Sequence, residues 1–171
     1  MKTLKINLTA LLLLILLYAC ETTSTEPVIE NNNSAIGIND TTYMQHFAHY
    51  SAVITDAVHH GDTPRGYRVD WYFEGSFTGS RISGTMEGID YYLIRPDGVS
   101  EINAFCTITT NDGAAISVHI MGLCFADGTI KDSYVKLETG FEEYMWVNNT
   151  VFTGFGTAPS DNTLEIDYYN Y

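Results

Sequence analysis

The chain has 171 residues, of which 17% are charged, and it contains 12 Tyr and 8 Phe, enough for one domain with a hydrophobic core. Its formal charge is −13, and removal of a leader with Lys2 and Lys5 leaves six basic against 21 acidic residues, a charge near −15. Such a charge repels phosphate backbones, so the composition argues against nucleic-acid binding and favours solubility in an extracytoplasmic space.

A bacterial lipoprotein signal is predicted at the N-terminus. Lys2 and Lys5 form a positive region, and residues 8–18 (LTALLLLILLY) are an apolar segment too short to cross a bilayer as a helix. The segment Leu17-Tyr18-Ala19-Cys20 resembles the lipobox of the lipoprotein signal peptidase, although Tyr is less usual at its position. An ordinary secretory signal is the alternative.

The lipobox resemblance implies a lipid anchor. Cleavage before Cys20 would remove residues 1–19, and acylation of Cys20 with chains such as palmitate would hold the protein at a membrane. Glu21 is compatible with transport to the outer membrane. We therefore expect a location in the bacterial cell envelope, with the domain outside the cytoplasm.

Residues 20–40 are polar and lack a sustained apolar period, which predicts a flexible tether. The folded domain is expected over residues 41–171. Its first segment is ambiguous: a strand is favoured over residues 50–58, with a helical turn possible over 43–49. A turn over 59–66 then leads to a strand over 67–77, where apolar and polar residues alternate.

Short strands predict an all-β fold for the rest of the domain. Their expected ranges are 81–87, 89–95, 99–110, 115–123, 133–139, 150–156 and 162–169, with a helical turn over 141–148. Eight or nine strands at short spacing indicate a single antiparallel β-barrel or sandwich.

Two Asp-Gly pairs, Asp97-Gly98 and Asp112-Gly113, predict tight hairpin turns around the strand 99–110. If Asp112 and Gly113 form a two-residue loop, Cys106 lies opposite His119. A three- or four-residue loop shifts these pairs, and an odd shift moves Cys106 away from His119. The face of Ile116 and its alternate neighbours is expected to be the more buried one.

The hairpin register also bears on the cysteines. It places Cys124 near Glu101, five residues along the strand from Cys106, or roughly 16–17 Å. A disulfide requires Cα atoms within about 7 Å. We therefore predict that Cys106 and Cys124 are free, mostly buried thiols.

Seven short motifs resemble, in order and spacing, the domain of unknown function 3237 family. They are Phe77-Thr78-Gly79-Ser80-Arg81-Ile82-Ser83-Gly84, Gly88-Ile89-Asp90, Arg95-Pro96-Asp97-Gly98, Thr110-Asn111-Asp112-Gly113-Ala114, Thr139-Gly140, Tyr144-Met145-Trp146-Val147-Asn148 and Gly154-Phe155-Gly156. The likeness covers roughly residues 50–170. It implies a compact calycin-like (lipocalin-like) antiparallel barrel and no settled reaction.

The chain departs from that family pattern after the first Asp-Gly turn. Many members have Leu-Asp-Val-Arg where this chain has Ile102-Asn103-Ala104-Phe105, so an amide and an aromatic ring replace an acid and a base. Any chemistry that this pair performs in relatives is then absent. The lipoprotein leader is also untypical of the family and suggests a binding or envelope role.

Six residues are candidates for ligand binding in a barrel mouth: Arg81, Asp90, His119, Tyr144, Trp146 and Asn148. A small barrel can hold one small ligand, which converging polar groups would orient. Three of them also have a structural explanation: hydrogen bonds to the backbone at turns for Asp90 and Asn148, and closure of one barrel end for Trp146. In that second role we expect Trp146 to be largely buried, with its indole N–H paired.

Catalytic and metal-binding patterns are weak. Cys106 with His119 would form a thiolate–imidazole dyad only if they are neighbours, and no third group is evident. His46 and His49 would share one face only in a helix, and adjacent His59 and His60 diverge. We predict no metal and no cofactor.

Two functions follow as hypotheses. The first is a lipid-anchored, non-enzymatic barrel that binds a small, partly apolar molecule or contributes to envelope organisation. The second is a small-molecule enzyme, such as an isomerase, cyclase or hydrolase, that uses acid and base groups in the barrel mouth. The sequence leaves the ligand and the oligomeric state open.

Overall fold

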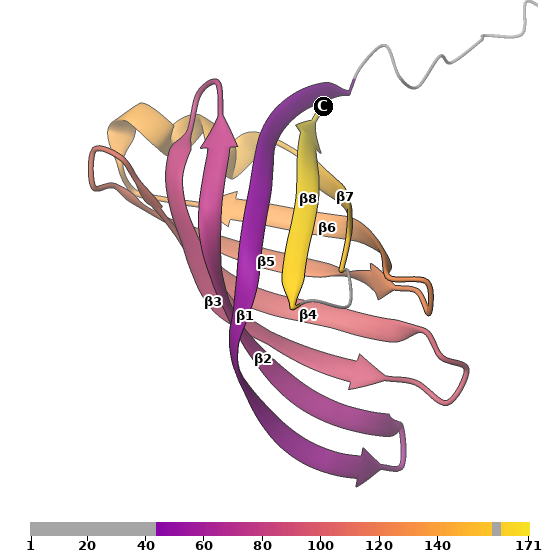
Figure 1. Ribbon diagram of the computed structural model, residues 1–171. Helices are drawn as coiled ribbons and strands as arrows, with labels where there is room; N and C mark the ends of the chain where they lie inside the picture. Colours follow the sequence, from indigo (N-terminus) through magenta and orange to yellow (C-terminus); the bar gives the residue numbers. More distant parts are fainter. Residues whose placement is uncertain (1–43, 159–161) are drawn as a thin grey trace, which may run out of the picture. The chain divides into compact units, whose positions relative to one another are not determined.

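The computed structural model describes residues 44–158 and 162–171, which form eight antiparallel strands closed into a barrel (Figure 1). The strands are β1 (Gln45–Thr63), β2 (Gly66–Gly79), β3 (Ser83–Ile94), β4 (Ser100–Thr110), β5 (Ala115–Cys124), β6 (Thr129–Glu138), β7 (Phe152–Thr157) and β8 (Thr163–Asn170). Each pairs with its neighbour in sequence, and β1 pairs with β8. The predicted single antiparallel barrel is confirmed.

Strict alternation in the sequence of β4 explains how a strand builds the core. Ile102, Ala104, Cys106 and Ile108 are buried, while the residues between them lie on the outer surface. Successive side chains point to opposite faces of a strand, so the apolar set faces the barrel interior. The inward side chains of all eight strands form one hydrophobic core.

The first strand is longer than the sequence indicated. β1 runs over 19 residues, so a helical turn over 43–49 is wrong, and the expected turn over 59–66 shrinks to the residues between Thr63 and Gly66. Register shifts near Ile54 and His59 mark bulges that bend the strand. β8 pairs with β1 only from Gln45 to Val53, and Figure 1 shows the β1–β2 hairpin reaching beyond β8.

The segments expected as separate strands over 81–87 and 89–95 form the single strand β3. Gly88, at the expected break between them, lies inside this strand, where a Cβ would be only 2.5 Å from the Phe105 carbonyl oxygen. β6 begins at Thr129, four residues before its predicted start. The two remaining strands lie within two residues of their predicted bounds.

The β4–β5 hairpin has a three-residue loop in place of the predicted two-residue loop. Its backbone closes with Thr110 N–H donating to the Ala114 carbonyl at 2.9 Å, and Gly113 adopts a φ of +91°. The pairing therefore moves by one residue: Phe105 lies opposite His119, and Cys106 lies opposite Val118. The predicted Cys106–His119 pair is wrong, and His119 lies on the outer face.

Both described cysteines are free and buried, as predicted. Cys124 pairs with Ser100, one residue further from Cys106 than the predicted register placed it. The prediction of free thiols is correct in spite of the register error, because either register separates the two thiols by several residues along the strands.

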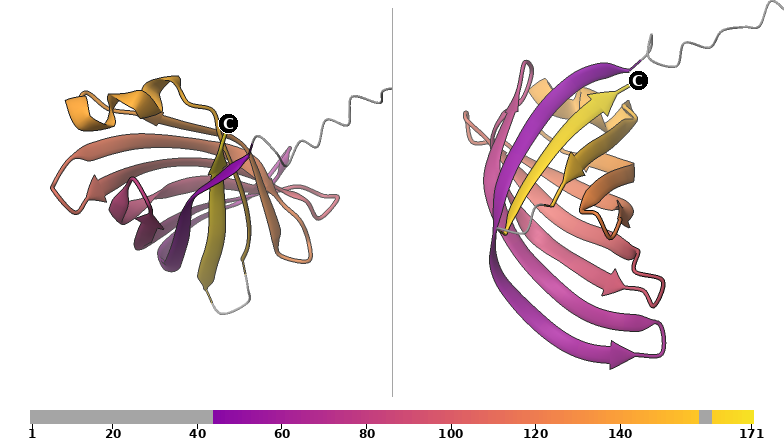
Figure 2. Two further views of the ribbon diagram at one scale, coloured as in Figure 1. Left: turned by 90° about the horizontal axis from the view of Figure 1, so that it is seen from above. Right: turned by 45° about the vertical axis from the view of Figure 1, so that its right-hand side comes forward.

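A short 3₁₀ segment, η2 (Glu142–Asn149), connects β6 to β7 and lies across one end of the barrel (Figure 2). Its Val147 side chain is buried in the core. Inside this end, aromatic rings of β1, β2 and β7 fill the interior: Phe47 lies 4.7 Å from Phe152 and 5.8 Å from Phe77 between ring centroids. The expected helical turn over 141–148 is thus present and contacts this packed end.

The predicted signal peptide, Cys20 and the tether lie outside the described residues. Within residues 44–158 and 162–171, no helix combines the length and the apolar character required to cross a bilayer.

Candidate functional site

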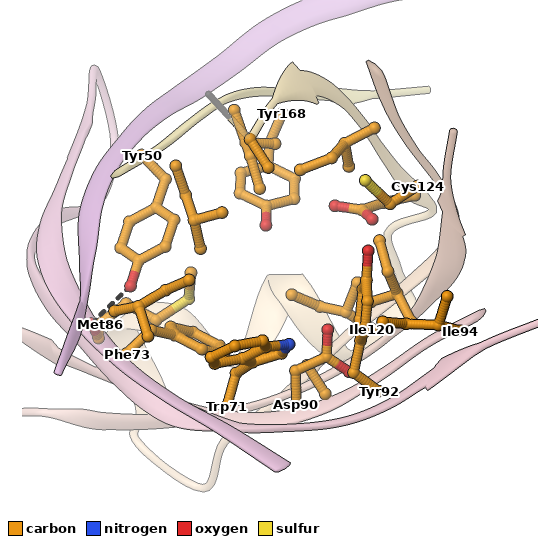
Figure 3. A pocket seen from close by; sticks show the side chains of 18 residues that line it. Tyr50, Trp71, Phe73, Met86, Asp90, Tyr92, Ile94, Ile120, Cys124 and Tyr168 are labelled. Carbon is orange, nitrogen blue, oxygen red and sulfur yellow. Dashed lines mark hydrogen bonds between the residues drawn. The ribbon is translucent and has the colours of Figure 1, made fainter. Parts of the chain in front are cut away.

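A cavity of about 330 Å³ occupies the half of the barrel opposite η2 (Figure 3). Its wall is mostly apolar and aromatic, with Trp71, Phe73, Ile120 and Tyr168 among the side chains around the central space. The volume is within the range of small-molecule sites, roughly 300–1,000 Å³. The two halves therefore differ: one is packed by aromatic rings, and the other is hollow.

Asp90 lines the cavity from β3 and is buried. The β3–β4 pairing passes from Asp90–Ala104 directly to Leu93–Glu101. In this interval the backbone N–H of Asn103 donates a 2.8 Å hydrogen bond to Asp90 Oδ1. One carboxylate oxygen thus has a fixed partner, which orients the group at the cavity wall.

Asp132 lines the same cavity from β6 and is only 2% exposed. Neither of its carboxylate oxygens, nor the hydroxyl of Tyr168, has a hydrogen-bond partner among the described residues. The Tyr168 hydroxyl is close enough to Asp132 to lower the pKa of that carboxyl, but the two groups do not meet the distance and angle limits of a hydrogen bond. Buried polar groups are nearly always paired, so these two are unusual for a folded core.

Glycines on both neighbouring strands leave space for the Asp132 carboxylate. A Cβ at Gly122 of β5 would lie 2.7 Å from Asp132 Oδ1, and a Cβ at Gly154 of β7 would lie 3.0 Å from Oδ2. The pairing of β6 is also irregular on both sides, with shifts beside Gly122 and between Asp132 and Val135. Such irregularities redirect side chains and are common next to functional sites.

Both carboxyl groups have raised pKa values. Burial raises the pKa of Asp90 to about 7, against the Asn103 hydrogen bond and the charge of Arg68, which lower it. Burial, and then the charge of Asp90, raise the pKa of Asp132 to about 7. Because two negative charges in one cavity repel each other, an ionised Asp90 makes ionisation of Asp132 less favourable.

Four of the sequence-predicted site residues, Arg81, Tyr144, Trp146 and Asn148, lie at the η2 end. The Arg81 guanidinium carbon is 3.4 Å from the centroid of the Trp146 ring. Asn148 bridges the backbone of Thr139, accepting from its N–H at 2.8 Å and donating to its carbonyl at 2.9 Å. Trp146 is half-buried, less than expected, and its indole N–H has no hydrogen bond to any described residue.

The Tyr144 hydroxyl, also from η2, donates a 3.0 Å hydrogen bond to Asp112 Oδ2 in the β4–β5 turn. None of the four η2-end residues lines the cavity, whereas Asp90 does. The structure thus brings Arg81 and Trp146 together and places Asp90 in the other half of the barrel.

His119 lies on the outer surface. Its ring stacks on Phe105 with centroids 4.3 Å apart, and its Nε2 is 3.0 Å from Asn103 Oδ1. Phe105 is 51% exposed. Asn103 and Phe105, the two residues that depart from the family pattern, therefore project outward, and their inward neighbours Ile102 and Ala104 line the cavity.

The thiolate–imidazole dyad is not formed. Cys106 points inward while His119 points outward, and burial raises the pKa of the Cys106 thiol far above its usual range. On the outer surface, His46 and His49 both contact Asp167 Oδ1, at 3.1 and 2.9 Å. A register shift between His46 and Ala48 places both rings on one face without a helix. In the described part of the chain, no three His, Cys, Asp or Glu side chains are arranged to hold a metal.

Asp132 was missed by the sequence reasoning, although a signal existed. Ile130 and Asp132 share the inward phase of β6, and an acidic residue in that phase is the exception that marks a buried polar site. The shift before Val135 breaks the alternation, so the segment did not resemble a regular strand from its true start.

Over the described residues the chain is thus a closed antiparallel β-barrel whose interior contains a cavity lined by two buried carboxyl groups. The family described as "Protein of unknown function (DUF3237)" matches residues 43–171, and the chain belongs to this family. The resemblance identified from the sequence motifs is thereby confirmed.

Named relatives agree with this assignment. A UPF0311 protein of Clostridium acetobutylicum is 27% identical over 112 residues, which cover 53% of this chain and 68% of the relative. A β-barrel-like protein of Acinetobacter baumannii has a TM-score of 0.65 at 21% identity over 74% of this chain and 95% of its own. A structure described as an enzyme from Penicillium herquei has a TM-score of 0.56 at 26% identity over 74% and 92%.

Proposed function

We propose that the protein binds one small, largely apolar molecule inside the barrel. The observation that carries this proposal is the 330 Å³ cavity, whose wall is apolar apart from a few convergent polar groups. Enclosed apolar walls with few oriented polar groups are typical of ligand sites. A barrel of eight strands has the diameter to hold one small ligand.

A cavity-filling substitution tests this proposal. Ala104 lines the cavity, whereas Ala115 is exposed on β5, so Ala104→Leu should abolish binding of 1-naphthylmethanol and Ala115→Leu should leave it unchanged. Isothermal titration calorimetry gives affinity and stoichiometry, and thermal melts verify that both variants are folded. Equal affinity in a folded Ala104→Leu variant, or no binding to the wild type, would refute the proposal.

A second function, acid–base catalysis on the bound molecule, is favoured by the paired carboxyl groups. With pKa values of about 7, one group can be ionised as a base while the other stays protonated as an acid. The similar Penicillium herquei protein is described as an enzyme. The outward Asn103 and Phe105 do not weaken this candidate, because they lie outside the cavity.

Proton transfer is the simplest activity to measure. We expect the wild type to accelerate exchange of the benzylic protons of 1-naphthylacetone in D₂O, followed by NMR, with a rate maximum near neutral pH. Asp90→Asn and Asp132→Asn should each remove the acceleration, and Glu87→Gln, an exposed residue of β3, should retain it. Exchange no faster than in buffer alone would leave the binding function and exclude this activity.

We also propose that Cys20 anchors the protein to the bacterial outer membrane, with the domain outside the cytoplasm. The lipobox-like segment over 17–20 and the polar stretch that follows it support this proposal. Cys20→Ala should abolish incorporation of labelled palmitate and leave an uncleaved precursor. Unchanged labelling in that variant would show that the anchor lies elsewhere.

A further inference from the structure

The carboxyl groups that line the cavity have no described basic side chain beside them in its wall. Asp90 and Asp132 contribute carboxyl groups, and of the described residues that line the cavity none is Lys, Arg or His. The Tyr50 hydroxyl is already used, since it donates to the Met86 carbonyl at 2.9 Å. The cavity therefore offers negative charge to a ligand, besides the neutral polar groups of Trp71, Tyr92 and Tyr168, and no described basic side chain of its wall neutralises that charge.

Asp132 is the group most in need of a partner. It is almost fully buried, and both its oxygens lack hydrogen-bond partners among the described residues. The absence of a side chain at Gly122 and Gly154 leaves the space that its carboxylate occupies. An ionised carboxylate without a counter-charge is costly to bury. A ligand that donates hydrogen bonds and carries positive charge removes this cost.

Aromatic rings complete the environment of a cation. Tyr50, Trp71, Phe73, Tyr92 and Tyr168 all line the cavity, and Figure 3 shows them around the central space with Asp90. The faces of aromatic rings attract ammonium groups, and such rings form the cages that recognise substituted amines. Carboxyl groups and aromatic rings thus favour the same kind of ligand.

We propose that the ligand is a compact apolar molecule bearing a protonated amine, whose ammonium group pairs with the Asp132 carboxylate. This inference rests on the proposed binding function and adds the chemical class of the ligand. An alcohol of the same shape would donate one hydrogen bond without neutralising the charge. A carboxylic acid would bring a third negative group into the cavity and bind most weakly.

The ionisation of the two carboxyl groups, together with their charged and titratable neighbours, determines whether the affinity for the ligand rises or falls with pH. Arg68 and Asp70 of β2 act on Asp90. Asp132 interacts electrostatically with Asp90, Tyr168, Cys106 of β4 and Cys124 of β5. An ammonium group binds the ionised carboxylate, so its affinity should rise with pH up to about 7 and then level. A ligand that accepts from the protonated carboxyl shows the opposite trend.

The experiment compares 1-naphthylmethylamine, 1-naphthylmethanol and 1-naphthoate, which share one ring system, by calorimetry on the wild-type protein. At pH 8 we expect the amine to bind at least about tenfold more tightly than the alcohol, and naphthoate to bind most weakly. Between pH 8 and pH 5.5 the amine should lose about tenfold in affinity or more, while the alcohol changes little.

Variants then test whether the preference for the amine depends on Asp132. Asp132→Asn should abolish the preference for amine over alcohol, and Glu87→Gln, which removes one exposed charge from β3, should keep it. The wild-type pH series stands as a test even if Asp132→Asn fails to fold. Equal affinity for amine and alcohol, or an amine affinity that falls as pH rises, overturns the inference and leaves the proposed function intact. Failure of all three probes to bind overturns both.

Discussion

The guanidinium of Arg81 lies over the face of the Trp146 ring, with 3.4 Å between the guanidinium carbon and the ring centroid. Arg81 belongs to the β2–β3 turn and Trp146 to η2, so this contact joins η2 to a turn that is remote in sequence. Trp146 also packs edge-on against Phe47, 6.0 Å away between centroids. The contact holds η2 across the packed end of the barrel.

A double-mutant cycle tests this relationship. Arg81→Gln should reduce the free energy of unfolding by about 0.5–1 kcal/mol, the range for an exposed cation–π pair, and should have no effect in a Trp146→Ala background. Trp146→Ala alone should cost about 2–3 kcal/mol, less than a fully buried aromatic ring, because the side chain is half-buried. Urea unfolding measures all four proteins. Additive effects of the two substitutions would show that the contact contributes nothing.

Removing the Asp132 carboxylate should stabilise the fold in a pH-dependent way. Its folded-state pKa of about 7 lies above its ordinary 3.8, so the folded protein retains a proton that the unfolded chain releases. Stability therefore falls as pH rises from about 4 to about 7. Asp132→Asn should match the wild type near pH 4 and exceed it at pH 8 by a free energy on the order of 2–4 kcal/mol.

Thermal melts at several pH values measure this difference, with Asp127→Asn as the control. Asp127 lies in an exposed turn, and hydrogen bonds from Thr129 lower its pKa, so its substitution should destabilise the fold slightly at neutral pH. A constant offset between Asp132→Asn and the wild type across the pH range would contradict a buried, protonated Asp132.

The space beside Asp132 should tolerate no extra methyl group. Gly122→Ala would place a Cβ 2.5 Å from the Lys131 carbonyl oxygen and 2.7 Å from Asp132 Oδ1. We expect a loss of about 1–3 kcal/mol in unfolding free energy from this overpacking. Gly140→Ala is the matched control, because a Cβ there meets nothing within 4 Å. Equal urea midpoints for the two variants would show that β5 and β6 can separate to accept the methyl group.

The two thiols should react only when the barrel opens. Cys106 and Cys124 are buried and free, and burial raises the pKa of each thiol, so little reactive thiolate is present. Mass spectrometry after iodoacetamide treatment should find both cysteines alkylated in denaturant, and much slower labelling of the native protein. Failure of either to react in denaturant without reductant would reveal a disulfide.

The sequence predicted the strands well because β4 and β5 alternate regularly and because Asp-Gly marks the hairpins. The Asp-Gly turns at 97–98, 112–113 and 127–128 each have a glycine in the left-handed region, at φ values of +82°, +91° and +81°. The length of the β4–β5 loop could not be predicted from the sequence, because Asp-Gly suits both a two-residue turn and a three-residue loop with a left-handed glycine. This difference of one residue in loop length determines whether His119 lies opposite Cys106 or on the outer surface.

The candidate site was less predictable for a related reason. Asp90 was found through the family-like motif Gly88-Ile89-Asp90. Asp132 depends on irregular pairing of β6 with both neighbours, and no local pattern encodes such irregularity. The meeting of β3 and β6 across a hollow interior is a property of barrel closure, which links residues far apart in sequence.

The pairing of β1 with β8 closes the barrel, and it can form only after the last strand has been synthesised. Gln45 pairs with Asn170, and the Asp167 carboxylate there meets both His46 and His49. Until synthesis of the last strand, β1 and β7 each present an unpaired edge, and such edges favour association between chains. Contacts of such large sequence separation also form slowly. Loss of β8 alone would therefore turn the closed barrel into an open sheet with two unpaired edges that favour association between chains.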